Sequence, residues 1–436
     1  MTGNEQPGGR LRVTETRKQC ERNDRKPKCL GCGDFLPKPF LDLGRTPLAN
    51  SFLKASTDCA GEQMFPLAVA YCETCHLVQL LDTVRPEKIF CEYAYFSTYS
   101  ESFLEHARIM AQALSDRLSL NSSSRILEIA SNDGYLLRHF KQRGMEVLGV
   151  DPAQNIAAEA NKQGIPTLCR FFNRDLAFDI VQGFGKADLI VGNNVLAHVP
   201  EINNFLLAVA DCLKAEGAVV FEFPYVRELL DEVEFDTIYH EHVFYLSLSA
   251  IQILADRAGL ELFEVIRQPV HGGSLRVFLQ HPQARPVAGS VTRMLSEETR
   301  IGLTSGARYA ALAPQASKLK YQLRSMLCEI KADGKRIAAY GAPAKGNTLL
   351  NFCGIGRDLL DFTVDRSPHK QGRLLPGSHL PILPPEELLA RMPEFTVILP
   401  WNIAREIIEQ QKAYLQRGGR FIVPVPRPRV VESAAD

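Results

Sequence analysis

The fold of this chain is constrained most by the stretch from Arg125 to Asp151. An apolar run over residues 125–129 passes through the small and acidic residues 130–134 into a helical pattern, and a second apolar run over residues 147–150 ends at Asp151. A strand, a tight turn, a helix, a second strand and an acid are the opening unit of a doubly wound, nucleotide-binding α/β sheet. A buried strand followed by a tight turn without a ligand is the alternative.

The turn between the two strands indicates the cofactor. A dinucleotide site needs Gly-x-Gly-x-x-Gly so that a pyrophosphate can approach the helix N-terminus. Here Ala130, Asn132 and Gly134 occupy the glycine positions, and acidic Glu128 precedes them, which disfavours a phosphate. S-adenosylmethionine (SAM) carries an ammonium and a sulfonium that suit this turn, and its ribose hydroxyls suit a carboxylate. Cofactor contacts are therefore predicted at Glu128, Ala130, Asn132, Gly134, Asp151 and Pro152, and at Asn193 and Asn194, which end a later strand.

Length, charge and cysteine content limit the class of protein. A chain of 436 residues is too long for one core and predicts two or three domains. The net charge is zero, and no apolar run reaches the ~18 residues that span a bilayer, so neither a nucleic-acid partner nor a membrane is expected. A polar N-terminus without a signal-peptide core and eleven cysteines fit a reducing cytoplasm. Oligomeric state is not indicated.

Two Cys-x-x-Cys pairs predict a metal site in the N-terminal region. Cys29-Leu-Gly-Cys32 and Cys72-Glu-Thr-Cys75 are separated by 39 residues, the arrangement of two knuckles that together supply four thiolates. Four sulfurs complete a tetrahedral zinc shell, so the Zn²⁺ is predicted to be structural, and this small segment needs it in order to fold. The alternatives are unconnected cysteines, a redox-active pair, and His76 as a substitute ligand.

The chain divides into four predicted segments. Residues 1–26 are a polar lead-in that we expect to be disordered, and residues 27–91 form the zinc-binding module. Residues 92–285 alternate strand and helix patterns and form the SAM-binding domain. Residues 286–436 begin with a long helical stretch over about 288–333 and then repeat the strand, turn, helix, strand and acid order, which predicts a second Rossmann-like domain.

The turn of this last domain has a different character from the first. It carries Gly341, Lys345 and Thr348 and no acid, so it suits an anion such as a diphosphate. Substrate contacts are predicted there at Gly341, Lys345 and Asn347. A Rossmann-like domain retained only for packing is the alternative.

The run Tyr239-His240-Glu241-His242 is the candidate for acid–base chemistry. Consecutive ionisable and phenolic groups flanked by apolar residues are costly to bury. On a helix Tyr239 and His242 share a face, whereas His240 and His242 share one only in an extended segment. Either arrangement can place a base beside an orienting carboxylate. A metal site and a satisfied polar cap are the alternatives.

Two further tracts are candidates for substrate contacts. His271-Gly-Gly-Ser274 offers flexible backbone donors directly before a strand, and we predict contacts at His271, Gly272 and Ser274. Tyr93, Tyr95, Ser97 and Tyr99 form a hydroxyl-rich cluster whose phenols can bind a sugar or stabilise an oxyanion. Ordinary loop and packing roles are the alternative for both.

The order of these motifs resembles one enzyme family. The chain is similar to the SAM-dependent sugar C-methyltransferases that act on nucleotide-linked 4-keto-deoxysugars, over nearly all of residues 29–424. The resemblance rests on the cysteine quartet, residues 128–134, Asn193-Asn-Val-Leu-Ala-His198, Tyr239–His242, His271–Arg276 and Gly341–Asn347, in that order.

The resemblance implies a zinc-binding module, a class I (Rossmann-like) SAM methyltransferase domain and a Rossmann-like C-terminal domain that binds the nucleotide sugar, usually dTDP-linked. It assigns His242 as the base that removes the proton next to the ketone, and Glu241 as its orienting partner. Tyr239, His198 and one of Tyr93 or Tyr95 would position the substrate or stabilise the enolate. The methylated carbon would be C-3, beside a C-4 ketone.

Three other functions compete with this one. One is a related zinc-containing SAM enzyme that acts on a non-sugar ketone or on oxygen, and methylation of oxygen can proceed mainly by proximity and orientation. An RNA-modifying methyltransferase would need a basic, aromatic surface that the composition does not indicate. A non-catalytic scaffold would not need the intact Tyr239–His242 run.

Overall fold

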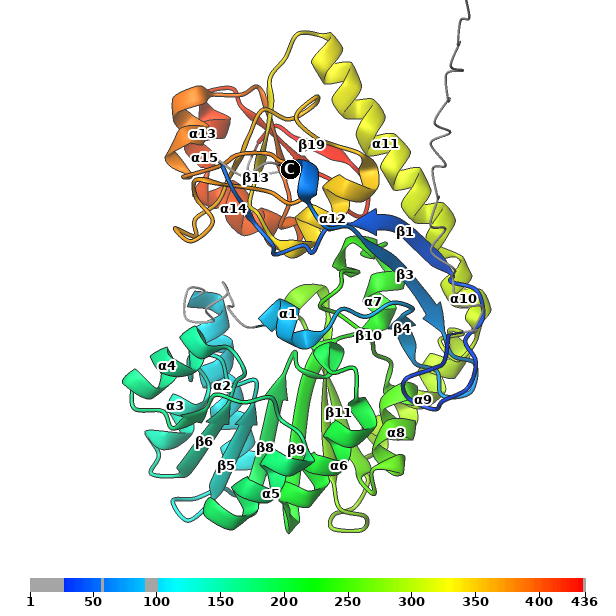
Figure 1. The fold of residues 1–436 in the computed structure, drawn as a ribbon, viewed down its shortest axis with the longest axis vertical. Coiled ribbons are helices and arrows are strands. Elements are labelled where there is room, and N and C mark those ends of the chain that lie inside the picture. The colour runs from blue at the N-terminus through cyan, green and yellow to red at the C-terminus, as the bar shows by residue number, and fades with distance from the viewer. Residues whose placement is uncertain (1–26, 56–58, 91–100, 434–436) are drawn as a thin grey trace, which may run out of the picture.

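The computed structural model describes residues 27–55, 59–90 and 101–433 of the chain (Figure 1). The lead-in over residues 1–26 and the candidate residues Tyr93 and Tyr95 lie outside the described residues. The described chain forms three main sheets, of four, seven and six strands. Figure 1 shows the seven-stranded sheet in the lower part of the molecule, the six-stranded sheet in the upper part, and the four-stranded sheet beside them both.

The seven-stranded sheet is the doubly wound sheet that the sequence predicts. Its order is β11-β12-β9-β8-β5-β6-β7, and β12 runs antiparallel to both of its neighbours while the other neighbouring pairs are parallel. The strands are β5 (Arg125–Ile129), β6 (Glu146–Val150), β7 (Thr167–Leu168), β8 (Ala187–Asn193), β9 (Leu213–Pro224), β11 (Glu261–Gln268) and β12 (Ser274–Gln280). The chain order reverses between β5 and β8, and ligands of open α/β sheets bind at the carboxyl ends of the strands at such a point.

Helices cover both faces of this sheet because the strand side chains alternate. Ile126 points into one apolar cluster with α2 and α3, and Leu127 points into another with α5, α6 and α8. Both strand residues are fully buried, as continuous apolar strands in a parallel sheet require. The helices are α2 (Glu101–Arg117), α3 (Leu137–Lys141), α4 (Gln154–Lys162), α5 (Arg174–Gly183), α6 (Ile202–Cys212), α7 (Val226–Asp231) and α8 (Leu248–Arg257).

The six-stranded sheet confirms the second Rossmann-like unit. Its order is β16-β14-β13-β17-β18-β19, with only β19 antiparallel to its neighbour. Counted along the chain from β13, this is the order 3-2-1-4-5-6 of nucleotide-binding sheets. Its elements are β13 (Ile337–Tyr340), α12 (Ala344–Cys353), β14 (Thr363–Val364), β16 (Ile382–Leu383), α13 (Glu386–Arg391), β17 (Phe395–Ile398), α14 (Ala404–Gln410), α15 (Lys412–Gln416), β18 (Arg420–Val423) and β19 (Arg429–Val431).

The helical stretch predicted over residues 288–333 consists of three helices. The structure has α9 (Gly289–Arg300), α10 (Gly306–Ala310) and α11 (Leu312–Ala332). Gly302 has a φ of 80°, in the left-handed region that glycine adopts without strain, and it ends the first helix. The sequence pattern predicted the helical stretch but not this break.

The four-stranded sheet combines two parts of the chain. Its order is β1-β3-β4-β10, all antiparallel, where β1 (Leu41–Thr46), β3 (Phe65–Tyr71) and β4 (Val78–Leu80) belong to the cysteine-containing region. The edge strand β10 (Phe244–Tyr245) comes from far along the chain and begins two residues after His242. Phe244 pairs with Gln79 and Tyr245 with Val78. The sheet of the N-terminal module therefore includes the strand that follows the candidate catalytic segment.

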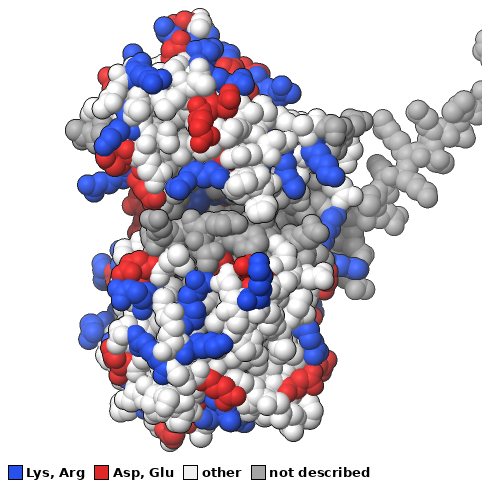
Figure 2. Space-filling view, turned by 90° about the vertical axis from the view of Figure 1, so that its left-hand side faces the viewer, with Lys and Arg blue, Asp and Glu red and all other residues white. Residues whose placement is uncertain are grey.

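Charged side chains of both signs are interspersed over the face in Figure 2, in keeping with the zero net charge. Among the described residues, none of the helices is long and apolar enough to cross a membrane.

Candidate functional site

The turn after β5 is held in its shape by the acid at the end of β6. Asp151 accepts the N–H of Asn132 at one carboxylate oxygen (3.1 Å) and the N–H of Ala153 at the other (2.9 Å). Ala130, Asn132 and Gly134 have φ angles of 59°, 48° and 77°, so all three stand in the left-handed region. Burial raises the pKa of Asp151 to about 6, and its carboxylate retains lone pairs for ribose hydroxyls.

The same turn contains buried oxygens that lack a protein donor. Both carboxylate oxygens of Glu128, the Ser131 hydroxyl and the Asn193 amide oxygen make no hydrogen bond in the structure. Burial, followed by the charges of Asp151 and Asp133, raises the pKa of Glu128 well above its usual range. Unpaired buried acceptors at the ends of β5 and β8 fit a cationic ligand, because they are costly without one. The predicted SAM, with its ammonium and sulfonium, meets this requirement.

The other predicted cofactor residues lie at the same strand ends. Asn193 ends β8 and donates to the Tyr135 hydroxyl (3.1 Å), which leaves its amide oxygen as the available acceptor. Asn194 follows it with a φ of 53° and donates its N–H to the carbonyl of Glu222. Pro152 is half-buried beside Asp151. The structure thus brings the eight predicted cofactor residues to one edge of the sheet.

The segment with Tyr239, His240, Glu241 and His242 is a turn between the N-terminal and central sheets. The N–H of His242 binds the carbonyl of Tyr239 (2.9 Å), so these residues meet at the spacing expected for a helical turn. On one side His240 donates to the carbonyl of Pro66 in β3 (3.1 Å). On the other side the N–H of Val243 binds the carbonyl of Ala197 (2.7 Å), which lies just beyond the end of β8.

The hydrogen bonds of His242 define its proton-accepting atom. Its Nδ1 lies 3.1 Å from the carbonyl of Thr237, which can only accept, so Nδ1 carries the proton of the neutral ring. Its Nε2 then holds the lone pair, and the Tyr239 hydroxyl donates to it (2.8 Å). The His242 ring is therefore oriented by a backbone carbonyl and presents a basic nitrogen.

His198 lies against this base. The two imidazole rings are edge-on with centroids 4.9 Å apart, and His198 Nδ1 donates to the backbone carbonyl of Glu241 (2.7 Å). Complete burial lowers the pKa of His198 to about 4, so the ring is neutral near pH 7. Its Nε2 is then an acceptor, which suits positioning of a substrate hydroxyl better than stabilisation of an enolate.

The structure corrects the prediction that the Glu241 carboxylate orients His242. The Glu241 carboxylate accepts a hydrogen bond from the Asn50 amide (2.6 Å), while the carbonyl of Thr237 orients His242. The residues are adjacent in sequence, but in a turn their side chains leave the backbone in different directions. Burial raises the pKa of Glu241 to about 7, although Asn50 and the charge of Lys370 lower it in part.

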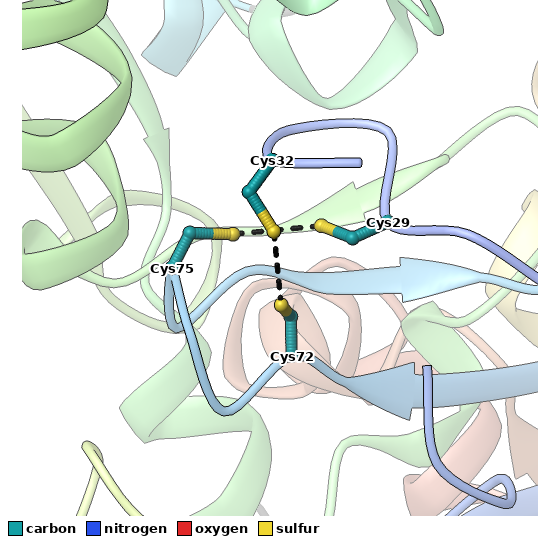
Figure 3. Close-up of side chains that lie close together, drawn as sticks. All are labelled: Cys29, Cys32, Cys72 and Cys75. Carbon is teal, nitrogen blue, oxygen red and sulfur yellow. Dashed lines mark hydrogen bonds between the residues drawn. The ribbon is translucent and has the colours of Figure 1, made fainter. Parts of the chain in front are cut away.

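The four cysteines converge as predicted (Figure 3). Their Sγ atoms all lie within 4.8 Å of one another, and none of the four forms a disulfide. This separation fits a tetrahedral ion with bonds of about 2.3 Å to sulfur. His76 instead binds the Tyr71 hydroxyl through Nδ1 (2.6 Å), and the quartet is the one metal-binding cluster among the described residues.

The central domain forms hydrogen bonds to the first cysteine knuckle. Asn203 of α6 donates to the carbonyls of Leu30 (3.1 Å) and Gly31 (3.0 Å), and Arg257 at the end of α8 also donates to Gly31 (2.8 Å). A Cβ at Gly31 would lie 2.9 Å from the Leu77 side chain and 3.2 Å from that of Leu254 in α8, so a larger residue would force these side chains to shift. The metal-bound turn is consequently part of the interface with the central domain.

The predicted substrate contacts in the C-terminal turn already have protein partners. Lys345 is buried, donates to Asn402 (2.8 Å) and lies over the Trp401 ring. Asn347 donates to the carbonyl of Ala49 in the N-terminal module. The Gly341 N–H binds the carbonyl of Val364 (2.6 Å). Binding of substrate by these residues stays a prediction.

The tract at residues 271–274 is a tight turn before β12. Gly272 has a φ of 92°, and a Cβ there would meet the Glu234 carboxylate at 2.6 Å, so close packing requires glycine. Ser274 is buried and donates to the carbonyl of Val270 (3.1 Å). For His271 only the backbone is described, in a short 3-10 turn over Val270–Gly272. Substrate binding here also stays a prediction.

Sequence reasoning missed two buried polar groups around the site. His106 (2.7 Å) and Arg276 (2.9 Å) both bind Glu222 near the carboxyl end of β9. Burial acts to raise the pKa of Glu222, but these two partners outweigh it and leave the pKa lowered. Asp236 accepts from the Trp401 indole (2.7 Å) and faces Lys345. No local pattern marks these residues, because their partners are distant in sequence.

Comparisons with known proteins agree with the geometry. Family profiles match residues 29–90 ("Putative zinc binding domain"), 103–265 ("Methyltransferase domain") and 269–426 ("C-methyltransferase C-terminal domain"). The C-methyltransferase NovU of Streptomyces niveus is 37% identical over 407 residues, which cover 93% of this chain and 97% of that protein. The chain belongs to this C-methyltransferase family. It is a SAM-dependent C-methyltransferase with a structural zinc site.

Solved structures resemble part of the chain. Magnesium protoporphyrin IX methyltransferase from Synechocystis PCC 6803 with bound SAM is 15% identical, with a TM-score of 0.32, over 41% of this chain and 79% of its own. The PH0226 protein from Pyrococcus horikoshii OT3 is 14% identical, with a TM-score of 0.34, over 45% of this chain and 97% of its own. At this level they bear on neither substrate nor residue roles.

We predict that Glu128→Gln weakens SAM binding about 10- to 100-fold, because it removes a buried carboxyl group whose ionised form the cationic ligand would stabilise. Isothermal titration calorimetry measures the change. Glu146→Gln, at the exposed start of β6, is the control and should leave SAM affinity within about twofold. Equal affinity of Glu128→Gln and the unaltered protein would contradict the role of Glu128.

We predict that Cys72→Ser abolishes zinc binding and turnover, because four thiolates hold the ion and the strand that follows His242 pairs with the cysteine-containing module. Metal content by mass spectrometry and a methyl-transfer assay measure the two effects. Cys59→Ser, in the same module but outside the quartet, should retain both zinc and activity. A zinc-free Cys72→Ser protein with normal turnover would contradict the coupling.

Proposed function

We propose that this enzyme methylates the carbon next to the ketone, C-3, of a nucleotide-linked 4-keto-deoxysugar. The observation that carries the proposal is the fixed tautomer of His242, whose Nε2 presents a lone pair close to the strand ends of the SAM-binding sheet. Carbon becomes nucleophilic only after an adjacent proton is removed, so its methylation needs a positioned base, whereas methylation of oxygen relies mainly on proximity.

His242 is the proposed base. Its Nδ1–H is held by the Thr237 carbonyl, which also stabilises the imidazolium that forms when Nε2 accepts the substrate proton. The Tyr239 hydroxyl occupies Nε2 in the structure and must turn aside when the substrate binds, or hand on the proton. Once the proton has left, negative charge develops on the ketone oxygen, where the freed Tyr239 hydroxyl can donate.

His198 and Glu241 are the proposed positioning groups. His198 is neutral and buried against the base, so its acceptor nitrogen can fix a sugar hydroxyl without competing for the substrate proton. Glu241 contributes two hydrogen bonds to the site. Its backbone carbonyl accepts from His198, and its carboxylate accepts from Asn50. A tyrosine of residues 93–95 remains a candidate for the same purpose, outside the described residues.

When bound, SAM supplies an electrophilic methyl group on a sulfonium. The chain's contribution is to hold that cation with the unpaired acceptors of Glu128, Ser131 and Asn193. The strand that bears Asn193 continues through a short 3-10 turn, Leu196–His198, to the His198 ring beside the base. His198, a few residues after Asn193 on this connection, contacts the ring of the proposed base, which favours a short transfer path between cofactor and base.

The C-terminal sheet is the proposed nucleotide site. Its chain order reverses between β13 and β17, where the Gly341 turn and the Pro400–Trp401 segment meet, and a Cβ at Gly341 would lie 2.6 Å from Pro400. A dTDP-linked sugar that lay here could reach His242 across the interface. We further propose the division into residues 27–91, 92–285 and 286–436, with β10 shared between the first two. A cytoplasmic location stays a prediction.

The function is tested by mass spectrometry of reactions with labelled SAM and a panel of nucleotide-linked 4-ketosugars, in zinc-containing buffer. We expect one labelled methyl group on carbon and loss of the C-3 proton to solvent. Labelled product only from non-sugar ketones, or a label on oxygen, would favour the related methyltransferases over the proposed one.

We predict that His242→Ala lowers turnover by a factor of about 10²–10⁴, because the base is lost, while SAM affinity is unchanged. Exchange of the C-3 proton with deuterium oxide, followed by nuclear magnetic resonance, separates the proton-transfer step from methyl transfer.

Tyr239→Phe serves as the matched variant. It removes the proposed oxyanion donor but leaves the Thr237 contact, so turnover should fall by about 10²- to 10³-fold. Proton exchange at the normal rate in His242→Ala would rule out His242 as the base.

A further inference from the structure

The loop over residues 47–54 connects the N-terminal module to the C-terminal region and to the segment that carries Glu241. It leaves β1, and Asn347 of α12 donates to its carbonyl at Ala49. The next residue, Asn50, donates to the Glu241 carboxylate (2.6 Å). Leu53 and Lys54 then form strand β2, which pairs antiparallel with β15 (Arg373–Leu374) of the C-terminal region.

Asn50 is therefore fixed from both sides. The preceding carbonyl is held by the C-terminal domain, and the chain that follows is held by a strand pair with the same domain. Between them, the ring of Phe52 lies 5.4 Å from the Lys370 ammonium. Because the backbone on either side of Asn50 is held, its side chain loses less entropy when it binds a carboxylate, and the charge of the acceptor strengthens the hydrogen bond.

We propose that Asn50 is a positioning residue of the methyltransferase, and that the loop over residues 47–54 uses it to hold the Glu241 carboxylate ionised and aimed into the sugar site. This inference rests on the proposed function and extends it. It assigns the N-terminal module a direct part in the reaction, beyond the zinc-dependent fold that supports β10.

The charged and titratable groups around Glu241 come from every element packed against it. Lys370 approaches from the C-terminal domain, and His198 binds the Glu241 backbone carbonyl from the central domain. His240 and His242 flank it on its own segment, and they bind the carbonyls of Pro66 and Thr237. Lys370 in turn donates to the carbonyl of Ala342 (2.9 Å). Among these groups, Asn50 donates the hydrogen bond to the carboxylate itself.

These contacts determine how the pKa of Glu241 changes when the Asn50 donor is removed. Burial raises the pKa of Glu241 to about 7, and the Asn50 hydrogen bond opposes that rise. The amide N–H stabilises the ionised carboxylate, so its removal raises the pKa further. Activity that needs the ionised form is present above this pKa and is lost as the pH falls through it. Loss of the Asn50 donor therefore moves the acid limb of the pH–rate profile to higher pH.

The test is the pH dependence of turnover in the full-length, zinc-loaded enzyme. Asn50→Leu removes the donor at similar volume and should move the acid limb up by about one pH unit, a loss of about tenfold in rate below the limb. Asn50→Asp places a second carboxylate beside Glu241 and should move it further. In the Glu241→Gln background, neither substitution should move the limb again.

Asn203→Leu is the matched control. It also removes side-chain hydrogen bonds between the N-terminal and central regions, at Leu30 and Gly31, but it does not touch Glu241. It should leave the acid limb unchanged even where it lowers zinc affinity or stability. Zinc content and circular dichroism confirm that each variant is folded.

Failure of the proposed function and failure of the Asn50 role give different results. If the unaltered enzyme methylates none of the 4-ketosugars, the proposed function fails, and infrared titration of the carboxyl band against Glu241→Gln still measures the pKa order. If the unaltered enzyme is active but Asn50→Leu loses rate equally at every pH, or shifts the limb no more than Asn203→Leu, the positioning role is overturned.

Discussion

The pairing of β10 with β4 is the contact on which the site depends. It places the two residues after Val243 in the sheet of the zinc-containing module, while the Val243 N–H binds the central domain at Ala197. The segment that carries His242 is therefore fixed at its C-terminal end by contacts with both the N-terminal sheet and the central domain, and these contacts restrict its conformation. The proposed base would need this precision to meet a carbon acid, since small misplacements are costly in rate. We expect zinc to act at a distance, by stabilising the sheet that contains β10.

The two Rossmann-like turns show how one backbone plan serves two electrostatic purposes. In both, the acid at the end of the second strand accepts an N–H from the turn after the first: Asp151 from Asn132, and Asp365 from Ala342. The first turn adds Glu128, whose buried oxygens lack a donor, and so favours a cation. In the second, Lys370 binds the carbonyl of Ala342, so the turn gains positive charge. The neighbouring side chains, rather than the backbone, set the preferred charge.

The accuracy of the sequence predictions depended on how local each signal was. The cysteine quartet and the Glu128–Gly134 turn were predictable, because thiolate spacing and strand–turn–helix order are written in short stretches. The helical stretch predicted over residues 288–333 is formed by three helices, and the break at Gly302 was not predicted. The partner of Glu241 was wrong, since Asn50 lies 191 positions away in the chain and nothing near either residue marks the contact.

The sequence by itself determined the chemistry that is available: an acidic turn for a cationic cofactor, four thiolates for zinc, and a histidine-rich run for proton transfer. Only the tertiary structure decided which of these groups meet. It oriented His242 with the carbonyl of Thr237 and directed Glu241 to Asn50. The physical reason is that residue type sets charge and hydrogen-bonding capacity, whereas the partner of a buried polar group is whichever donor or acceptor the packing of distant elements brings within about 3 Å.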